Sequence, residues 1–185
     1  LKNLKGVMPR AMKTAFHSAN LHKAIAQINS ILSPHLDVVD GLQGDLYSET
    51  GHDPVEMDRI MLGTNSVEVD SVVADMLGYA PREIRHIACS TDAGLGTCQL
   101  NQIDIHSLNR PKKTHRFRPP KPFSKRFPCR VSDQGACCTC MGNLMYALER
   151  LNERGLLSHK LSFVVGQEAK ATGLKNTLTI AVGKC

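Results

Sequence analysis

Apolar residues recur every three or four positions in several stretches of the chain, and this spacing predicts amphipathic helices. Ser33-Pro34 ends the first of these helices, Ser66 is expected to cap the second, and Pro81 opens the third. The four predicted helices cover about residues 13–32, 66–77 and 81–93, and the stretch from the cysteine-rich segment near residue 137 to Gly155.

Short aliphatic runs between the helices predict buried β-strands. The predicted strands cover about residues 35–41, 58–62, 102–106, 161–165 and 177–182. Residues 1–9 are expected to be extended, and the glycine-containing residues 42–56 are expected to form a long loop. Because helices alternate with short aliphatic strands, the pattern indicates an α/β fold in which helices flank a mostly parallel sheet.

A basic, proline-rich segment separates two parts of the chain. Residues 107–128 contain eight Lys and Arg residues, five prolines and no acidic residue. The whole chain has a net charge of +6, so the rest of the chain sums to −2. The predicted organisation is an α/β region over 1–106, a basic connector over 107–128, and a Cys-rich helix with two strands over 129–185 that completes the same domain.

The composition narrows the class of protein. With 42% hydrophobic residues, the 185-residue chain can build a core. We find no apolar run long enough to span a bilayer and no signal-peptide layout at the start. Seven cysteines, three of them within four residues, fit reactive or metal-bound thiols in a reducing cytoplasm better than a secreted disulfide scaffold. The start at Leu1-Lys-Asn-Leu is expected to be a cut within a longer protein.

The cysteine-rich segment is the main candidate site. Cys137 and Cys140 fall in the loop and first turn that open a helix, where backbone N–H groups and the helix dipole favour thiolate over thiol. Four thiolates are the usual ligands of a [4Fe–4S] cluster or a structural zinc. Cys129 is the nearest third ligand, Cys185 is the candidate fourth, and Cys138 is an alternative to Cys137.

Two chemical alternatives to an iron–sulfur centre remain open at this site, beside the interpretation that the cysteines are buried or loop residues without a ligand. One is zinc, which is less favoured because no histidine lies near the segment to complete a mixed ligand set. The other is thiol–disulfide chemistry by Cys137 and Cys140. Cys89 and Cys98 have no partner motif and are interpreted as core or surface thiols.

Asp40 and Asp70 are candidate catalytic acids. Asp40 is predicted to end a strand just before Gly41, and ligand sites in open α/β sheets lie beyond such strand ends. Its alternative role is to accept a hydrogen bond from a loop N–H group. Asp70 lies among valines in a predicted helix, and its alternative roles are a place on a solvated helix face or in a buried ion pair.

Three motifs in order resemble the prokaryotic domain-of-unknown-function family 362. They are Lys2-Asn-Leu-Lys-Gly-Val, Asp37-Val-Val-Asp-Gly and Asn65-Ser-Val-Glu-Val-Asp, and the resemblance covers about residues 1–105. It implies that the chain carries the C-terminal half of that domain. Members of the family are often associated with iron–sulfur modules, so the resemblance also implies iron rather than zinc.

A second, fainter resemblance is to nickel-pincer lactate racemases. Lys5-Gly-Val-Met-Pro, followed by His17 and His22, is similar to the lysine–proline–histidine layout with which those enzymes hold their cofactor. The resemblance implies a cofactor-binding role for Lys5, His17 and His22. Arg10 replaces the glycine expected after the proline, so we do not carry the activity over.

The sequence therefore predicts a cytoplasmic α/β protein with a cysteine-ligated centre, favouring an iron–sulfur cluster. The predicted function is electron transfer to a protein partner, or redox chemistry on a small molecule. A zinc-stabilised or thiol–disulfide binding module is the first alternative, and a racemase-like fragment is the second. Nucleic acid is not favoured as a partner, because the prolines of the basic segment fit a solvated connector better.

Overall fold

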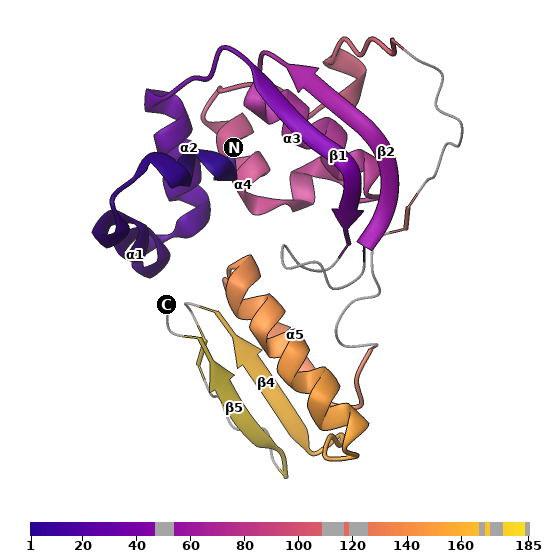
Figure 1. The fold of residues 1–185 in the computed structure, drawn as a ribbon. Coiled ribbons are helices and arrows are strands. Elements are labelled where there is room, and N and C mark those ends of the chain that lie inside the picture. Colours follow the sequence, from indigo (N-terminus) through magenta and orange to yellow (C-terminus); the bar gives the residue numbers. More distant parts are fainter. Residues whose placement is uncertain (47–53, 109–116, 119–125, 167–168, 171–175, 184–185) are drawn as a thin grey trace. The chain divides into compact units, whose positions relative to one another are not determined.

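The chain forms two compact units, each with its own core. The structure is a computed structural model that describes residues 1–46, 54–108, 117–118, 126–166, 169–170 and 176–183 (Figure 1). The first unit combines Leu1–Leu46 with Pro54–Pro119, and the second combines Tyr47–Asp53 with Pro120–Cys185. The predicted domain bounds stay a prediction, because a division into compact units does not decide which parts fold together.

The first unit is mainly helical. Its elements in chain order are η1 (Lys2–Val7), α1 (Arg10–Ala19), α2 (Leu21–Ile31), β1 (Asp37–Asp45), β2 (Pro54–Gly63), α3 (Ser66–Met76), η2 (Pro81–Glu83), α4 (Arg85–Asp92) and η3 (Leu100–Gln102). Helix α2 contacts α4, and α3 contacts both α4 and β2 (Figure 1). Ile25, Val67 and Ile87 are almost fully buried, so one aliphatic core lies among α2, α3 and α4.

Strands β1 and β2 form an antiparallel hairpin, with Asp37 opposite Gly63 and Asp45 opposite Pro54. The hairpin packs on α3 at Gly63, where an added Cβ would overlap the side chain of Val69. Because only a glycine allows this approach, the end of β2 lies directly against the helix.

Several predicted elements of the first unit differ from the structure. The predicted helix 13–32 is divided at Asn20, whose extended backbone ends α1 and whose side chain accepts a hydrogen bond from Lys23 N to cap α2. Residues 2–7 form a 3-10 helix instead of an extended segment, and residues 103–106 form no strand. Asn65, and not Ser66, caps α3, because its Oδ1 accepts hydrogen bonds from two backbone N–H groups.

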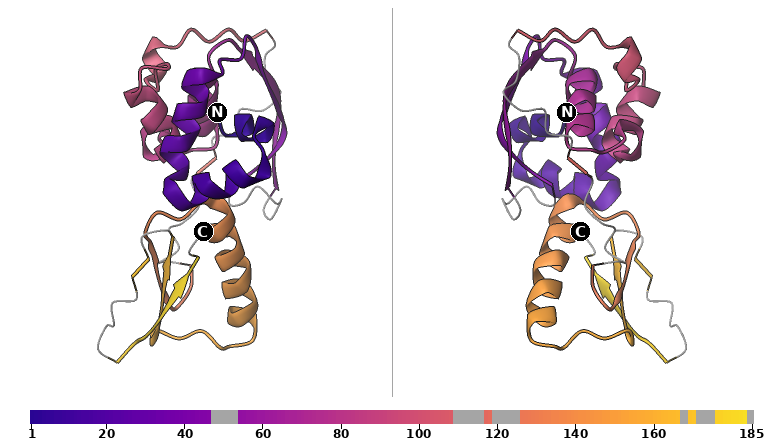
Figure 2. Two further views of the ribbon diagram at one scale, coloured as in Figure 1. Left: turned by 90° about the vertical axis from the view of Figure 1, so that its left-hand side faces the viewer. Right: turned by 90° about the vertical axis from the view of Figure 1, so that its right-hand side faces the viewer.

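The second unit is a βαβ arrangement with one further strand. Its elements are β3 (Arg130–Asp133), α5 (Cys138–Glu153), β4 (Leu161–Val165) and β5 (Leu178–Val182). The three strands are parallel in the order β3-β4-β5, and α5 covers one face of this sheet (Figure 2). The expected α/β class is therefore confirmed, and the parallel pairing that the sequence predicted is found in this unit.

The core of the second unit lies between α5 and the sheet. Its buried members are Phe127, Cys129, Leu144, Met145, Leu148, Phe163 and Val165. Strands β4 and β5 match their predicted ranges closely, whereas β3 was not predicted. Three of the four residues of β3 are polar or charged and exposed, so its sequence gives no aliphatic run.

Candidate functional site

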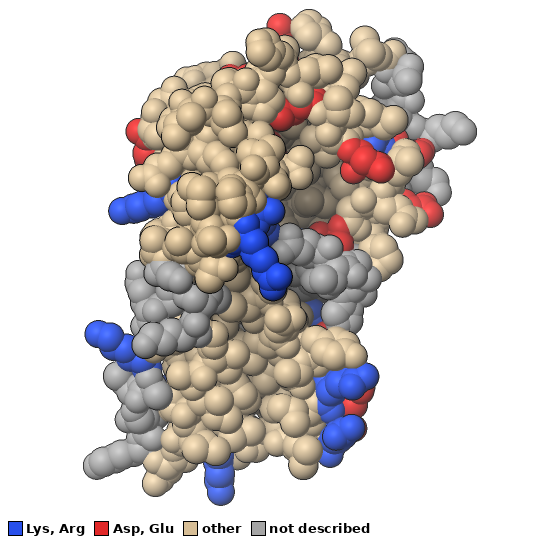
Figure 3. All heavy atoms as spheres, turned by 60° about the vertical axis from the view of Figure 1, so that its left-hand side comes forward, with Lys and Arg blue, Asp and Glu red and all other residues tan. Residues whose placement is uncertain are grey.

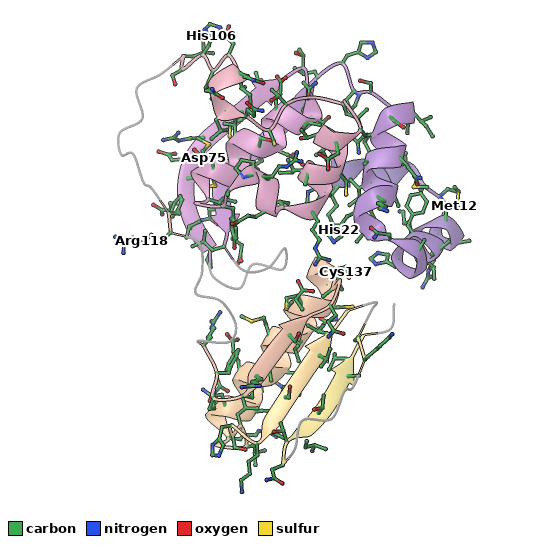
Figure 4. The ribbon with its side chains drawn as sticks, turned by 180° about the vertical axis from the view of Figure 1, so that it is seen from behind. Met12, His22, Asp75, His106, Arg118 and Cys137 are labelled. Carbon is green, nitrogen blue, oxygen red and sulfur yellow. The ribbon has the colours of Figure 1, made fainter. Side chains whose placement is uncertain are left out.

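Cys137 and Cys140 lie where the sequence placed them, at the start of α5 (Figure 4 labels Cys137). Cys137 is the N-cap residue, and its Sγ accepts a hydrogen bond of 3.5 Å from the backbone N–H of Cys140. Cys137 is buried and Cys140 is half-buried. Both thiols therefore belong to the first turn of a 16-residue helix, where the positive end of the dipole stabilises a thiolate.

The loop that carries Cys137 is held by hydrogen bonds at both of its ends. The backbone N–H of Gln134 donates to Val165 O at 2.7 Å, and that of Ala136 donates to Asp133 Oδ1 at 2.8 Å. Gly166 follows β4 with a φ of 129°, and an added Cβ there would overlap the carbonyl oxygen of Gln134. The end of β4 thus fixes the path of the cysteine loop.

The end of β5 reaches the second cysteine of the loop. Gly183 follows β5 with a φ of 78°, and a Cβ added to it would lie 3.0 Å from Cys140 Sγ. The carboxyl ends of parallel strands and the start of the connecting helix meet at one edge of a sheet, which is where α/β proteins place ligands. Cys185, the predicted fourth ligand, follows two residues after Gly183 and lies outside the described residues.

Cys129 and Cys138 differ from these two cysteines. Cys129 is 2% exposed and belongs to the core of the second unit. Burial raises the pKa of its thiol, which favours the neutral form over the thiolate that a metal ligand requires. Cys138 is the first residue of α5, and its side chain is outside the described part of the structure.

The cysteine loop offers the thiols of Cys137 and Cys140, and sulfur donors of this kind fit a thiophilic metal. Among the residues that the structure describes, no group of three or more His, Cys, Asp or Glu side chains is arranged to hold a metal ion. Two predicted ligands, the Cys138 side chain and Cys185, are not among those residues. The complete ligand set, with its iron–sulfur or zinc occupant, therefore stays a prediction.

Asp40 does not end its strand, because β1 continues to Asp45, and the prediction of a strand end at this position is wrong. Its Oδ1 accepts a hydrogen bond of 3.1 Å from the backbone N–H of Leu42. Asp40 is exposed and lies opposite Ile60 of β2. The Asp40 carboxylate thus accepts a hydrogen bond from its own strand and not from a loop, and a catalytic role for Asp40 stays a prediction.

Asp70 is part of a cluster with two histidines. Its Oδ2 lies 4.0 Å from His86 Nε2 and 3.2 Å from the Leu1 nitrogen, and burial raises its pKa. The ring of His86 stacks on that of His22, with centroids 6.2 Å apart. Burial, followed by the neighbouring His22, lowers the pKa of His86 to about 4, so this imidazole is neutral at pH 7.

His86 was not predicted from the sequence as a site residue. It lies in α4, within a segment where nothing about its spacing distinguished it from a surface histidine. The packing of α2 on α4 brings it to His22, and no local pattern records that contact. The sequence does contain a histidine in each of these two helices. Their contact could be expected only if the packing of α2 against α4 were already known.

The three residues of the racemase resemblance divide between two places. Lys5 Nζ lies 3.1 Å from His17 Nε2, which accepts the hydrogen bond as a neutral ring. His22 instead stacks on His86. A cofactor-binding role for Lys5, His17 and His22 stays a prediction.

The fold and the cysteine loop define an α/β protein with a thiol site at the carboxyl edge of a parallel sheet. Residues 1–75 match the family described as Domain of unknown function (DUF362), which confirms the predicted family for this part of the chain. That description names no activity. No curated protein and no solved structure matches the chain. In the part of the chain that the structure describes, no helix is both long and apolar enough to cross a bilayer.

Proposed function

We propose that the second unit is a cysteine-ligated metal centre of the iron–sulfur type, which serves electron transfer or redox chemistry on a small molecule. The observation that carries this proposal is the close approach of Gly183 to Cys140, since a Cβ added to Gly183 would lie 3.0 Å from Cys140 Sγ, beside the N-cap Cys137. This approach brings the end of β5, two residues before Cys185, to a pair of helix-start thiols.

Cys137 and Cys140 are the principal ligands in this proposal. The backbone N–H groups of the first turn of α5, such as that of Cys140 which donates to Cys137 Sγ, stabilise the thiolates that a metal requires. Cys138 and Cys185 supply the further thiolates, because one is adjacent to Cys137 and the other follows Gly183 closely in the chain. Cys129 is the least suitable of the five predicted ligands, because its burial favours a neutral thiol.

A bound iron–sulfur cluster supplies a one-electron couple. The residues of the chain hold the loop that carries the thiols. The backbone N–H of Gln134 donates to Val165 O, and that of Ala136 donates to the Asp133 carboxylate. Gly166 lies so close to Gln134 that the loop has no room to move toward the end of β4. Such outer contacts orient ligands and tune their affinity for the metal.

The test is metal and acid-labile sulfide analysis of the anaerobically purified chain, with Cys140→Ser as the key variant. We expect iron and sulfide in the unaltered chain and their loss in Cys140→Ser, because the serine hydroxyl does not replace a thiolate ligand. Cys89→Ser is the matched control, since Cys89 lies in α4 of the first unit. Equal metal content in Cys140→Ser and in the unaltered chain would refute the proposed site.

A second candidate function is thiol–disulfide exchange. It is favoured by the hydrogen bond from Cys140 N–H to Cys137 Sγ, which places both cysteines on one helical turn. One thiolate would attack a substrate disulfide and release a substrate thiolate, and the other cysteine would then displace the second substrate thiol as the Cys137–Cys140 disulfide forms. A colourless protein without metal that forms this disulfide with an oxidised glutathione probe would select this candidate.

A further inference from the structure

One face of the β1–β2 hairpin exposes its aliphatic side chains. Exposed and less exposed residues alternate along β2 and along β1 as far as Leu42, and the register shift between Gly41 and Gln43 leaves both Leu42 and Gln43 exposed. We define the hairpin face as the exposed residues between the pairs Val38–Leu62 and Gln43–Glu56, which are Val38, Asp40, Leu42, Gln43, Glu56, Asp58, Ile60 and Leu62.

The aliphatic content of the hairpin face is unusual for a surface. Its four aliphatic side chains, Val38, Leu42, Ile60 and Leu62, are between 52% and 67% exposed. They come from neighbouring strands, and Val38 lies directly opposite Leu62. Single exposed aliphatic residues are common, but a contiguous group on one sheet face marks an interaction surface.

The charge of the hairpin face specifies its partner. Asp40, Glu56 and Asp58 interleave with the aliphatic residues, and the face contains no Lys or Arg. Two hairpin faces that met each other would bring carboxylates together, which disfavours a symmetric contact. The complementary occupant is a surface that combines aliphatic side chains with basic ones.

The start of the chain has that chemistry. Residues 1–36 contain five Lys and Arg residues and no acidic residue. Around α1, Val7 is 67% and Met12 is 48% exposed, and Arg10 and Lys13 lie within one turn of each other (Figure 4 labels Met12). We call residues 7–17 the α1 segment. Figure 3 shows one face of the molecule, with Lys and Arg side chains in blue and Asp and Glu side chains in red.

We propose that the hairpin face of one copy of this protein binds the α1 segment of a second copy. Aliphatic contacts would bury Ile60 and Leu62 against Val7 and Met12, and the basic residues of α1 would face the three carboxylates. Because the hairpin face and the α1 segment are different surfaces, the contact between copies is head-to-tail. Each copy then keeps one unused surface, so association continues past a dimer unless the copies close into a ring. This interface is independent of the cysteine site.

Sedimentation of the 185-residue chain under reducing conditions tests the interface. We expect association that increases with protein concentration and weakens as salt is added. Ile60→Asp/Leu62→Asp should weaken it by about tenfold or more, because both aliphatic contacts are lost at the centre. Leu178→Asp is the matched control, since Leu178 is 63% exposed in β5 of the other unit. A monomer at every concentration would overturn the proposal.

A charge exchange identifies the α1 segment as the occupant. Arg10→Glu and Glu56→Lys are surface changes that should each weaken association alone, and circular dichroism checks that both variants stay folded. A mixture of the two variants should associate again, because the carboxylate introduced at position 10 of one copy can face the ammonium group introduced at position 56 of the other. Association that survives Arg10→Glu/Lys13→Glu, or a mixture that fails to recover, would overturn the assignment of α1.

Discussion

At the scale of single residues, the surroundings of a buried side chain decide what it can do. Cys129 and Cys137 are both buried cysteines of the second unit, yet they differ in surroundings. Cys129 lies in the hydrophobic core, where burial raises the pKa of its thiol, whereas Cys137 caps a helix. The sequence ranked Cys129 with the other ligands because spacing reports proximity along the chain, and it does not report desolvation.

The buried imidazole of His86 predicts how stability depends on pH. Its pKa is about 4 in the folded protein against an ordinary value of 6.5, so the unfolded chain binds more protons between these pH values. The contribution of His86 to the free energy of unfolding is therefore complete above about pH 6.5. It decreases as the pH falls toward 4, by up to about 3 kcal/mol. The raised pKa of Asp70 acts in the opposite direction above pH 3.8 and offsets part of this loss.

Urea unfolding at several pH values checks this prediction. His86→Gln should remove most of the pH dependence between 6.5 and 4, because glutamine has no titrating group. His106→Gln is the control, since His106 is exposed and bonds only locally to Asp104. If His86→Gln keeps the slope of the unaltered chain, the cause lies with other groups.

At the scale of elements, the sequence predicted the interiors of helices and strands better than their ends. Helix α5 and strands β4 and β5 lie close to their predicted ranges because each has a sustained apolar pattern. The break at Asn20 and the polar strand β3 were missed. In both, tertiary packing or a capping hydrogen bond overrides a weak local preference.

The glycine at the end of β4 carries a prediction about the second unit. Gly166→Ala should destabilise it by about 2–4 kcal/mol, because a Cβ overlaps Gln134 and a φ of 129° strains any residue with a side chain. Gly6→Ala is the matched control, because a Cβ there meets no atom within 4 Å. Chemical denaturation of both variants gives the comparison, and an equal effect would contradict the role of Gly166.

At the scale of the whole molecule, the two units have separate cores, so loss of metal should affect them differently. Because metal binding stabilises the fold that forms the site, treatment with a chelator should lower the stability of the second unit and leave the first unaffected. Hydrogen exchange followed by mass spectrometry can compare α5 with α2 in the same sample. Equal loss of protection in both helices would contradict a metal centre confined to the second unit.

The sequence by itself determined the α/β class, the resemblance of residues 1–75 to a known family, and the position of Cys137 and Cys140 at a helix start. These features depend on local patterns of apolar residues, turns and motifs. Only the tertiary structure brought Gly183 to Cys140, stacked His22 on His86, and left the side chains of the hairpin face exposed among the described residues. Each of these joins or exposes segments that are distant in the chain, and such contacts depend on packing, which local sequence does not encode.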